Sequence, residues 1–172
     1  MKKIRLFVDM DGTIAKFYYH KECLEKMYEK GYFANLKPYP IYKTIKQIAK
    51  RSASVEVFIL SACVESPYCE QEKLAWLNKY LPEIDKDHRI MVKVGENKAD
   101  YIPNDDGQDY YNILLDDYGK NLTEWVKADS NNVAIKFLNG INNKSGKVYN
   151  HKVKNGKQLT DKLLEMFLYG KK

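Results

Sequence analysis

The sequence has little of what marks secreted, metal-stapled or membrane-spanning chains. Its 172 residues include three cysteines and three histidines, and neither set follows a metal-ligand spacing. An odd number of scattered cysteines argues against a disulfide framework and indicates free thiols in a reducing compartment. No apolar run approaches the roughly 18 residues that a membrane span needs, and no signal peptide precedes the first apolar segment. We therefore expect a cytoplasmic protein that does not enter a membrane.

An excess of acidic charge is also missing. The net charge is +6, and residues 144–172 carry all of it, with eight lysines and two acidic residues. The rest of the chain balances, with 21 basic and 21 acidic groups. A basic segment of this kind can bind nucleic acid. A solvated helix face and loop is the commoner interpretation, and we favour it.

Five apolar, β-branched runs alternate with segments of helical periodicity. The composition, 44% hydrophobic and 30% charged, is that of a globular protein that can bury a core. The expected strands are Ile4–Val8, Val55–Leu60, Ile90–Val94, Ile113–Leu115 and Val133–Phe137, and helical stripes lie around residues 41–49, 74–81, 122–126 and 159–167. Strands that alternate with helices predict an α/β fold. We expect a doubly wound, Rossmann-like parallel sheet of about five strands, formed by residues 1–172 as a single domain.

The gap between the first two expected strands is longer than one crossover requires. Residues 17–30 are rich in aromatic side chains, and Gly31 is a plausible helix stop. The stretch GYFANLKPYP that follows is irregular and leads into the next helix. We therefore predict a small helical lid, residues 16–40, over the carboxyl edge of the sheet.

A pair of carboxylates follows the first expected strand directly. Asp9 and Asp11 stand one residue apart and are followed by Gly12. The carboxyl end of a strand in an α/β sheet faces the crevice where ligands bind. Two crowded carboxylates cost folding free energy unless a ligand or an ion uses them. A solvated loop of acidic turn residues after an edge strand is the alternative interpretation.

Three later strands also end near a reactive group. Ser61 follows the second strand, Lys98 lies beyond the third, and the pair Asp116-Asp117 follows the fourth. Each alone has an ordinary explanation, since serines often occupy turns and lysines are usually solvated. Because the carboxyl ends of parallel strands share one sheet edge, we expect these side chains to meet there.

Such a set of charges predicts a cation site. Two carboxylates ~4 Å apart repel by about 4 kcal/mol at an effective dielectric of about 20, so either some are protonated or a cation lies among them. A few hard oxygen ligands, with room for waters and a phosphate, suit Mg²⁺ better than Zn²⁺ or Ca²⁺. Lys98 and Ser61 would complete the surround that phosphoryl oxygens need. Lys93 and Lys120 are the alternatives to Lys98 in this role.

These residues, in this order, resemble the four motifs of the haloacid dehalogenase-like superfamily. The motifs are DMDGT at residues 9–13, Ser61, Lys98 and the pair Asp116-Asp117. The second aspartate, Asp11, is typical of the phosphatase branch and is absent from the dehalogenases themselves. The segments MDGTIAKF, GYFANLKPYP, FILSA and LLDDYGKNL are similar to those of the 5′(3′)-deoxyribonucleotidases and their bacterial relatives. The chain departs from that family in its shorter lid and in the Ser-Ala-Cys of residues 61–63, where nucleotidases usually show Thr-Ser-Pro.

The resemblance implies a Mg²⁺-dependent hydrolysis of a phosphate monoester. Asp9 would attack phosphorus and form an aspartyl-phosphate, and Asp11 would act as general acid and base, which requires it to arrive protonated. The residues implied to bind the phosphate are Gly12, Thr13, Ser61, Ala62 and Lys98. The metal would be held by Asp9, by the backbone carbonyl of Asp11, and by Asp116 or Asp117, with the direct ligand of the last two left open.

The aromatic residues of the predicted lid indicate what kind of leaving group the enzyme accepts. Phe17 and Phe33 lie in the predicted lid, where aromatic faces would stack on a nucleobase, so we expect a nucleoside monophosphate as the substrate. A polynucleotide end phosphatase that also uses residues 144–172 is one alternative, and a non-catalytic nucleic-acid-binding protein is another. A receiver domain is disfavoured, because there the acidic pair comes first and the phosphorylated aspartate stands on a later strand.

Overall fold

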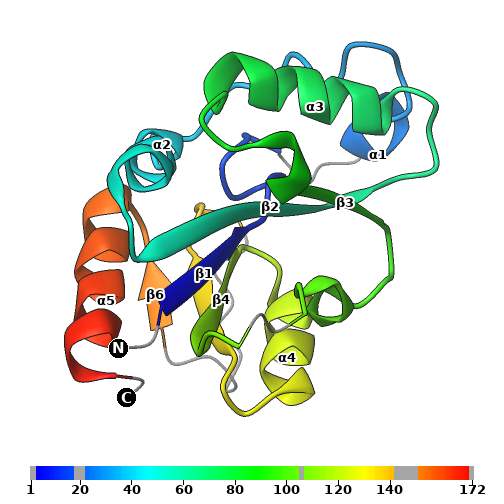
Figure 1. The fold of residues 1–172 in the computed structure, drawn as a ribbon. Coiled ribbons are helices and arrows are strands. Elements are labelled where there is room, and N and C mark those ends of the chain that lie inside the picture. Colours follow the sequence, from blue (N-terminus) through cyan, green and yellow to red (C-terminus); the bar gives the residue numbers. More distant parts are fainter. Residues whose placement is uncertain (1–2, 18–21, 105–106, 142–150, 171–172) are drawn as a thin grey trace.

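Six parallel strands form one sheet in the order β3-β2-β1-β4-β5-β6 (Figure 1). The structure is a computed structural model and describes residues 3–17, 22–104, 107–141 and 151–170. The strands are β1 (Lys3–Val8), β2 (Val55–Cys63), β3 (Arg89–Lys93), β4 (Tyr110–Asp116), β5 (Val133–Phe137) and β6 (His151–Val153). The predicted doubly wound α/β fold is confirmed. The sixth strand was not predicted, and it is only three residues long.

The strand order places two carboxyl ends together at the centre of the sheet. The chain runs from β1 outward to β3 and then returns to β4 on the other side of β1. Val8 pairs with Leu115, so the next residues, Asp9 and Asp116, leave their strands side by side. The Asp9 N–H also donates to the Leu115 carbonyl at 2.9 Å. A reversal of strand order of this kind opens the crevice where ligands bind in doubly wound sheets.

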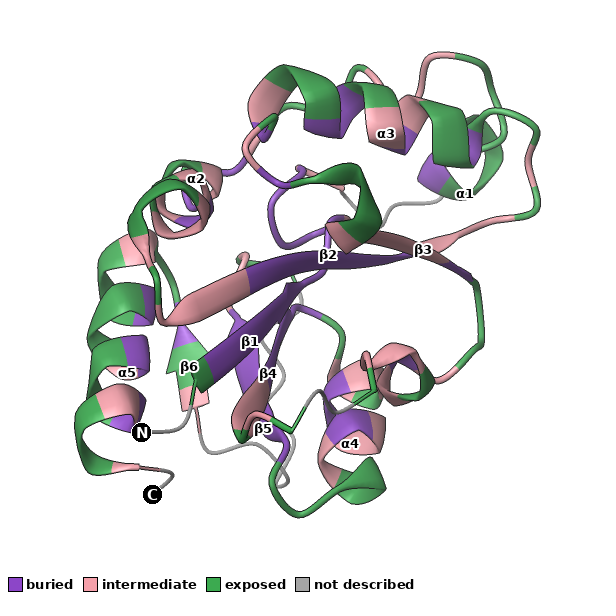
Figure 2. Ribbon diagram, in the orientation of Figure 1, coloured by how far each residue is buried: buried purple, intermediate pink, exposed green. Residues whose placement is uncertain are grey.

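Helices cover both faces of the sheet. They are α1 (Cys23–Lys26), α2 (Tyr42–Arg51), α3 (Cys69–Tyr80), α4 (Gly119–Ala128) and α5 (Gly156–Tyr169), with the 3₁₀ turns η1 (Lys86–His88) and η2 (Lys98–Tyr101). Helices α2, α3 and α5 pack on the face to which Leu6 points, and α4 with η2 packs on the face to which Phe7 points. Figure 2 shows the central strands buried and the helices buried on the side that faces the sheet. None of the described helices has the length and apolar character to cross a membrane.

The segment predicted as a lid is less helical than expected. Within residues 17–30 the only described helix is the single turn α1 (Figure 1). The two ends of the segment are joined, because Lys16 N–H donates to the Lys37 carbonyl at 2.7 Å and Tyr39 N–H donates to the Ile14 carbonyl at 2.8 Å. The segment therefore leaves and re-enters the sheet at one place, beside the end of β1.

Helix α5 closes the fold against α2 through a glycine. Asn155 caps α5 by accepting a hydrogen bond from Gln158 N–H at 3.0 Å, and the Gln158 side chain accepts one from Lys154 N–H at 2.7 Å. Gly156 then begins the helix directly against Thr44 of α2. A Cβ atom at Gly156 would lie 1.8 Å from Thr44 Oγ1 and 2.7 Å from Thr44 Cβ. Only glycine lets the two helices approach this closely.

We expect Gly156→Ala to lower the free energy of unfolding by about 1–3 kcal/mol, the usual range for overpacking. Urea denaturation measures it. Thr44→Ala in the same chain should restore part of the loss, because it removes Oγ1 and Cγ2 but leaves Cβ. Alanine is favoured over glycine inside helices by about 0.5–1 kcal/mol, so a helix start with room for the methyl group would become more stable instead. A Gly156→Ala chain as stable as wild type, or more so, would show that the α2–α5 contact does not need the glycine.

Candidate active site

The loop after β1 is shaped around Gly12. Gly12 has φ of +80°, and a Cβ atom there would lie 2.5 Å from Asp117 Oδ2. Its N–H donates to the Ala15 carbonyl at 2.9 Å, and Thr13 N–H donates to the Met10 carbonyl at 3.3 Å. Both amides are therefore engaged within the loop, and the phosphate-binding roles of Gly12 and Thr13 stay predictions. Because residue 12 is a glycine, the loop of residues 9–13 can lie in contact with Asp117.

Lys98 bridges the two central carboxylates. Its Nζ lies 2.6 Å from Asp9 Oδ1 and 2.8 Å from Asp116 Oδ2. All three side chains are buried, and Lys98 is the first residue of η2. The alternatives to Lys98 lie elsewhere, since Lys93 is exposed and Lys120 pairs with Glu124 along α4. Of the three lysines considered from the sequence, Lys98 is thus the one that contacts Asp9 and Asp116.

Asp117 is held by groups from three other elements. Its N–H donates to Thr13 Oγ1 at 3.1 Å, and its carbonyl accepts from Lys136 Nζ at 2.8 Å. Its Oδ2 accepts from Asn139 Nδ2 at 2.8 Å, and the same amide donates to the Gly12 carbonyl at 3.0 Å. Lys136 comes from β5 and Asn139 from the segment just after it. Sequence reasoning missed both, because a lysine inside a strand and an asparagine in a turn-rich stretch carry no distinctive spacing.

A second buried lysine, Lys73, was also missed. Its Nζ lies 2.6 Å from Asp11 Oδ2 and 3.0 Å from Ser61 Oγ, and it donates to the Ala62 carbonyl. Lys73 stands in the middle of α3 and is fully buried. The ring of Phe33 lies 4.9 Å from the same ammonium group. Lys98 is therefore not the only cation among the aspartates.

A cavity of about 610 Å³ opens over these groups. Its floor includes Asp9, Asp11 and Asp117, and Phe17 and Phe33 line it from the lid side. Further lining residues are Met27, Ala62, Val64, Val94, Asp116, Tyr118, Asn121, Asn139 and Ile141. Ser61 belongs to β2 itself and contacts Lys73 instead of lining the cavity. The structure thus gathers the predicted residues at one sheet edge, with Ser61 behind Lys73.

Burial dominates the electrostatics of the nucleophile candidate. It raises the pKa of Asp9 to about 8, although the Lys98 ammonium acts in the opposite direction. Burial lowers the pKa of Lys98, but Asp116 and Asp9 outweigh it and hold that pKa above its ordinary value. Burial also lowers the pKa of Lys73, but Asp11, Cys69 and Cys63 together outweigh it and raise the pKa of that ammonium group. Both lysines are charged, so the aspartates lie among fixed cations.

Three of these carboxylates lie close enough together to hold a hard divalent cation. Asp9, Asp116 and Asp117 each offer an oxygen, and these three oxygens lie within 4.8 Å of one another. All three side chains are buried, and Asp11 Oδ1 is a buried oxygen without a hydrogen-bond partner among the described residues. An all-carboxylate donor set of this size favours Mg²⁺ over softer metals.

Comparisons with known proteins agree with this geometry. The family model described as "5′ nucleotidase, deoxy (Pyrimidine), cytosolic type C protein" matches residues 20–150. That range contains Ser61, Lys98 and the Asp116-Asp117 pair, whereas the loop with Asp9 precedes it. No curated protein matches the chain significantly.

Solved structures share the fold at low identity. A haloacid dehalogenase-like hydrolase from Burkholderia xenovorans LB400 superposes with a TM-score of 0.62 at 11% identity, over 98% of this chain and 100% of that chain. A phosphoserine phosphohydrolase-like protein from Francisella tularensis subsp. tularensis SCHU S4 gives a TM-score of 0.53 at 13% identity, over 95% of this chain and 100% of that chain. At this identity the likeness shows the fold alone.

The raised pKa of Asp9 predicts a pH-dependent gain in stability for Asp9→Asn. The folded chain keeps the Asp9 proton to about pH 8, whereas the unfolded chain loses it near the ordinary value of 3.8. The stability that Asp9 contributes is therefore complete below that lower value and is lost as the pH rises toward 8. Asparagine does not titrate. The free energy of unfolding of the variant minus that of the wild type should therefore rise by more than about 1.4 kcal/mol between about pH 5 and about pH 8. Denaturation in a chelator measures this difference.

Asp161→Asn is the matched control, because Asp161 is exposed on α5 and pairs with Lys157 of the same helix. Its stability difference from wild type should stay nearly constant over the same range. A difference for Asp9→Asn that is equally flat would mean that burial does not hold a proton on Asp9.

Proposed function

The chain belongs to the family of 5′ nucleotidase, deoxy (Pyrimidine), cytosolic type C proteins, and on that premise we propose that it hydrolyses nucleoside monophosphates by a Mg²⁺-dependent reaction through an aspartyl-phosphate at Asp9. Membership makes the chain a phosphoric monoester hydrolase. The observation that carries the finer proposal is the buried contact of Asp9 with Lys98, beside Asp116, on the floor of a cavity large enough for a nucleotide. The family description includes the word cytosolic, and we place the enzyme in the cytoplasm.

In the first step, Asp9 in its ionised form attacks phosphorus with one carboxylate oxygen, and the ester P–O bond breaks. A divalent cation held by Asp9 and its neighbours would favour that ionised form over the protonated one. Asp11 stands two residues further along the same loop and must carry a proton at this point, which it gives to the leaving oxygen. Lys73, which contacts Asp11 Oδ2 before substrate binds, would turn to a phosphoryl oxygen at this step. Thr13 Oγ1 lies 3.4 Å from Asp9 Oδ2 and fixes the carboxylate plane. In the second step, water gives a proton to Asp11 and attacks phosphorus, and the bond to Asp9 breaks.

The lysine ammonium groups and asparagine amides around the site would hold the phosphoryl group and the carboxylates in position. Lys98 and Lys73 would bind phosphoryl oxygens from opposite sides, with Ser61 supporting Lys73. Asp9, Asp116 and Asp117, with the Asp11 carbonyl, would hold the metal. When bound there, Mg²⁺ supplies positive charge that offsets the charge developing on the phosphoryl oxygens. Asn121 Nδ2 donates to Asp116 Oδ2 at 2.8 Å, and Asn139 donates to Asp117, so both carboxylates are oriented before the metal arrives.

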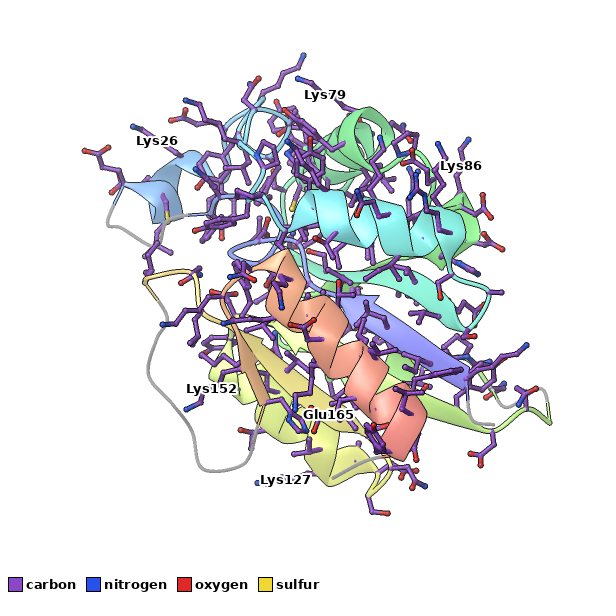
Figure 3. The ribbon with its side chains drawn as sticks, turned by 90° about the vertical axis from the view of Figure 1, so that its left-hand side faces the viewer. Lys26, Lys79, Lys86, Lys127, Lys152 and Glu165 are labelled. Carbon is purple, nitrogen blue, oxygen red and sulfur yellow. The ribbon has the colours of Figure 1, made fainter. Side chains whose placement is uncertain are left out.

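The alternatives that use residues 144–172 find no support in the described part of that segment. Lys157 pairs with Asp161 and Lys162 pairs with Glu165 along α5, as on a solvated helix face. Figure 3 shows the labelled lysines on separate elements, pointing away from the body of the molecule. We propose a small phosphate monoester as the substrate, and not a polynucleotide.

Asp9→Asn should abolish turnover without unfolding the chain, because asparagine is nearly isosteric but cannot form the acyl phosphate. The assay is phosphate release from a thymidine 5′-monophosphate and an aryl phosphate, each with Mg²⁺ and with a chelator. We expect activity only with the metal, and a loss of more than about a hundredfold in kcat for the variant. Asp161→Asn is again the control and should retain wild-type kcat. Metal-independent hydrolysis, or an active Asp9→Asn chain, would contradict the proposal.

The lid should make the enzyme prefer nucleotides. Phe33 and Phe17 both line the cavity, Phe33 as a buried ring 4.9 Å from Lys73 Nζ and Phe17 as a half-buried one. Stacking on a base contributes roughly 1–3 kcal/mol in other nucleic-acid sites. We expect a higher kcat/KM for a nucleoside monophosphate than for glucose 6-phosphate, and Phe33→Ala should remove much of that preference while sparing a small aryl phosphate. Equal wild-type kcat/KM values for the nucleoside monophosphate and glucose 6-phosphate would rule the nucleotide assignment out.

A second variant tests the lid without touching its rings. The Glu72 carboxylate accepts hydrogen bonds from the Gly31 and Phe33 N–H groups and so ties the lid to α3. Glu72→Gln should raise KM for the nucleotide and leave the aryl phosphate unchanged. Glu70→Gln, an exposed position on the same helix, should change neither.

A further inference from the structure

A tyrosine ring outside the lid is exposed in the wall of the substrate cavity. Tyr118 follows the Asp116-Asp117 pair directly, lines the cavity, and has 52% of its surface accessible. The two lid rings that line the same cavity are less accessible, since Phe17 is half-buried and Phe33 is buried. Large exposed apolar side chains that gather at one place mark a binding surface. Tyr118 is the most accessible of the described aromatic rings in this cavity.

The backbone of Tyr118 is fixed beside the aspartates. Its N–H donates to Asp116 Oδ1 at 2.7 Å, and its carbonyl accepts from Leu122 N–H at 3.4 Å in the first turn of α4. Asn121, in the same turn, donates to Asp116 Oδ2 at 2.8 Å. The ring of Tyr118 is therefore attached to an ordered helix start, whose position is set by a carboxylate that itself lines the cavity.

The lid and Tyr118 reach the cavity from opposite faces of the sheet. The amide of Phe33 in the lid is held by Glu72 of α3, and α3 packs on the face to which Leu6 points. Tyr118 precedes α4, which packs on the face to which Phe7 points. Figure 1 shows α3 and α4 on the two sides of the strands. Because both sets of rings line one cavity, a flat group bound there lies between the lid rings and Tyr118.

The mouth of the cavity is apolar on both sides of Tyr118. Val94, which follows β3, and Ile141, which lies beyond β5, line the cavity and are 62% and 44% exposed. Ile141 N–H donates to Asn139 Oδ1 at 2.8 Å, and the amide of Asn139 donates to Asp117. Among the described residues that line this cavity there is no lysine or arginine. Such a mouth suits an uncharged ring system better than a second phosphate group.

We propose that Tyr118 is a specificity-determining residue, and that its ring stacks on the nucleobase from the side opposite the lid. A tyrosine ring that is fixed at its backbone and exposed at its face presents a flat apolar surface to such a base. The effect on turnover rests on the proposed function, because the nucleotide substrate supplies the base. Contact between the ring and a free nucleoside does not require turnover.

The first measurement is the Kd of the full-length protein for thymidine, a nucleoside without phosphate, obtained by NMR titration. Tyr118→Ala should raise that Kd by at least about fivefold, the lower end of what stacking contributes per base. Tyr118→Phe keeps the ring and should bind as the wild type does. Tyr118→Leu keeps apolar volume without an aromatic face, so it should bind as weakly as Tyr118→Ala.

Tyr68→Ala is the matched control. Tyr68 precedes α3 as Tyr118 precedes α4, and Tyr68 does not line this cavity. This variant should leave the Kd for thymidine unchanged.

Kinetics separates stacking from a structural role at Asp116. Tyr118→Ala should lower the ratio of kcat/KM for thymidine 5′-monophosphate to kcat/KM for glucose 6-phosphate by at least about fivefold, because only the nucleotide has a flat ring system. Loss of support for Asp116 would lower both values and leave their ratio unchanged.

An unchanged ratio would overturn the proposal, as would an unchanged thymidine Kd in Tyr118→Ala. A Tyr118→Phe chain that binds thymidine as weakly as Tyr118→Ala would also overturn it, because the ring would then not carry the contact. A chain that hydrolyses neither substrate, but binds thymidine more weakly after Tyr118→Ala and not after Tyr68→Ala, would refute the proposed function and leave this inference standing.

Discussion

The negative charge of four aspartates at one sheet edge is the constraint on which the rest of the structure depends. Two carboxylates ~4 Å apart repel by about 4 kcal/mol at an effective dielectric of about 20, and here four of them share one crevice. Two buried lysines pair with these carboxylates, Lys73 from α3 and Lys98 from η2. A third buried lysine, Lys136 from β5, donates to the Asp117 backbone carbonyl. Removal of one partner from a buried ion pair typically costs about 3–5 kcal/mol. The elements that carry the lysines are therefore tied to the sheet by the chemistry of the site.

Helix α3 has the widest influence on that site. Lys73 contacts Asp11, and Glu72 and Trp76 donate to or accept from backbone groups of the lid segment. One helix thus sets the position of a buried cation beside Asp11 and of the aromatic residues that line the cavity. If Lys73 binds phosphate as proposed, substrate selection and phosphate binding should both respond to a mutation in this helix.

Much of the fold could be predicted from the sequence, because a parallel strand buried on both faces is a continuous apolar run, as in Ile4–Val8. Asp9, Lys98 and Asp116 could be placed because each follows such a run. Strand β6 could not, since it has only three residues, His151–Val153, and two of them are polar. Lys73 could not, because a lysine in a helix usually points to solvent, and only the tertiary fold turns this one inward.

The lid shows a different limit. Its position between the first two strands and its aromatic residues could be predicted from the sequence. The helical lid that we expected is reduced, among the described residues, to the single turn α1, since local propensity is a weak guide where tertiary contacts decide. Those contacts, from Glu72 to the amides of Gly31 and Phe33, join residues about forty positions apart. No periodicity in the sequence encodes them.

The central claim is that Asp9 becomes phosphorylated during turnover, and trapping that intermediate tests it most directly. An Asp11→Asn chain given Mg²⁺ and an aryl phosphate should still form the acyl phosphate, because an aryl leaving group needs little protonation, but should hydrolyse it slowly without the general base. Acid quenching followed by peptide mass spectrometry should find one phosphoryl group on the peptide that contains Asp9. Turnover of the aryl phosphate with no phosphoryl group on that peptide, or with the group on another residue, would contradict the account.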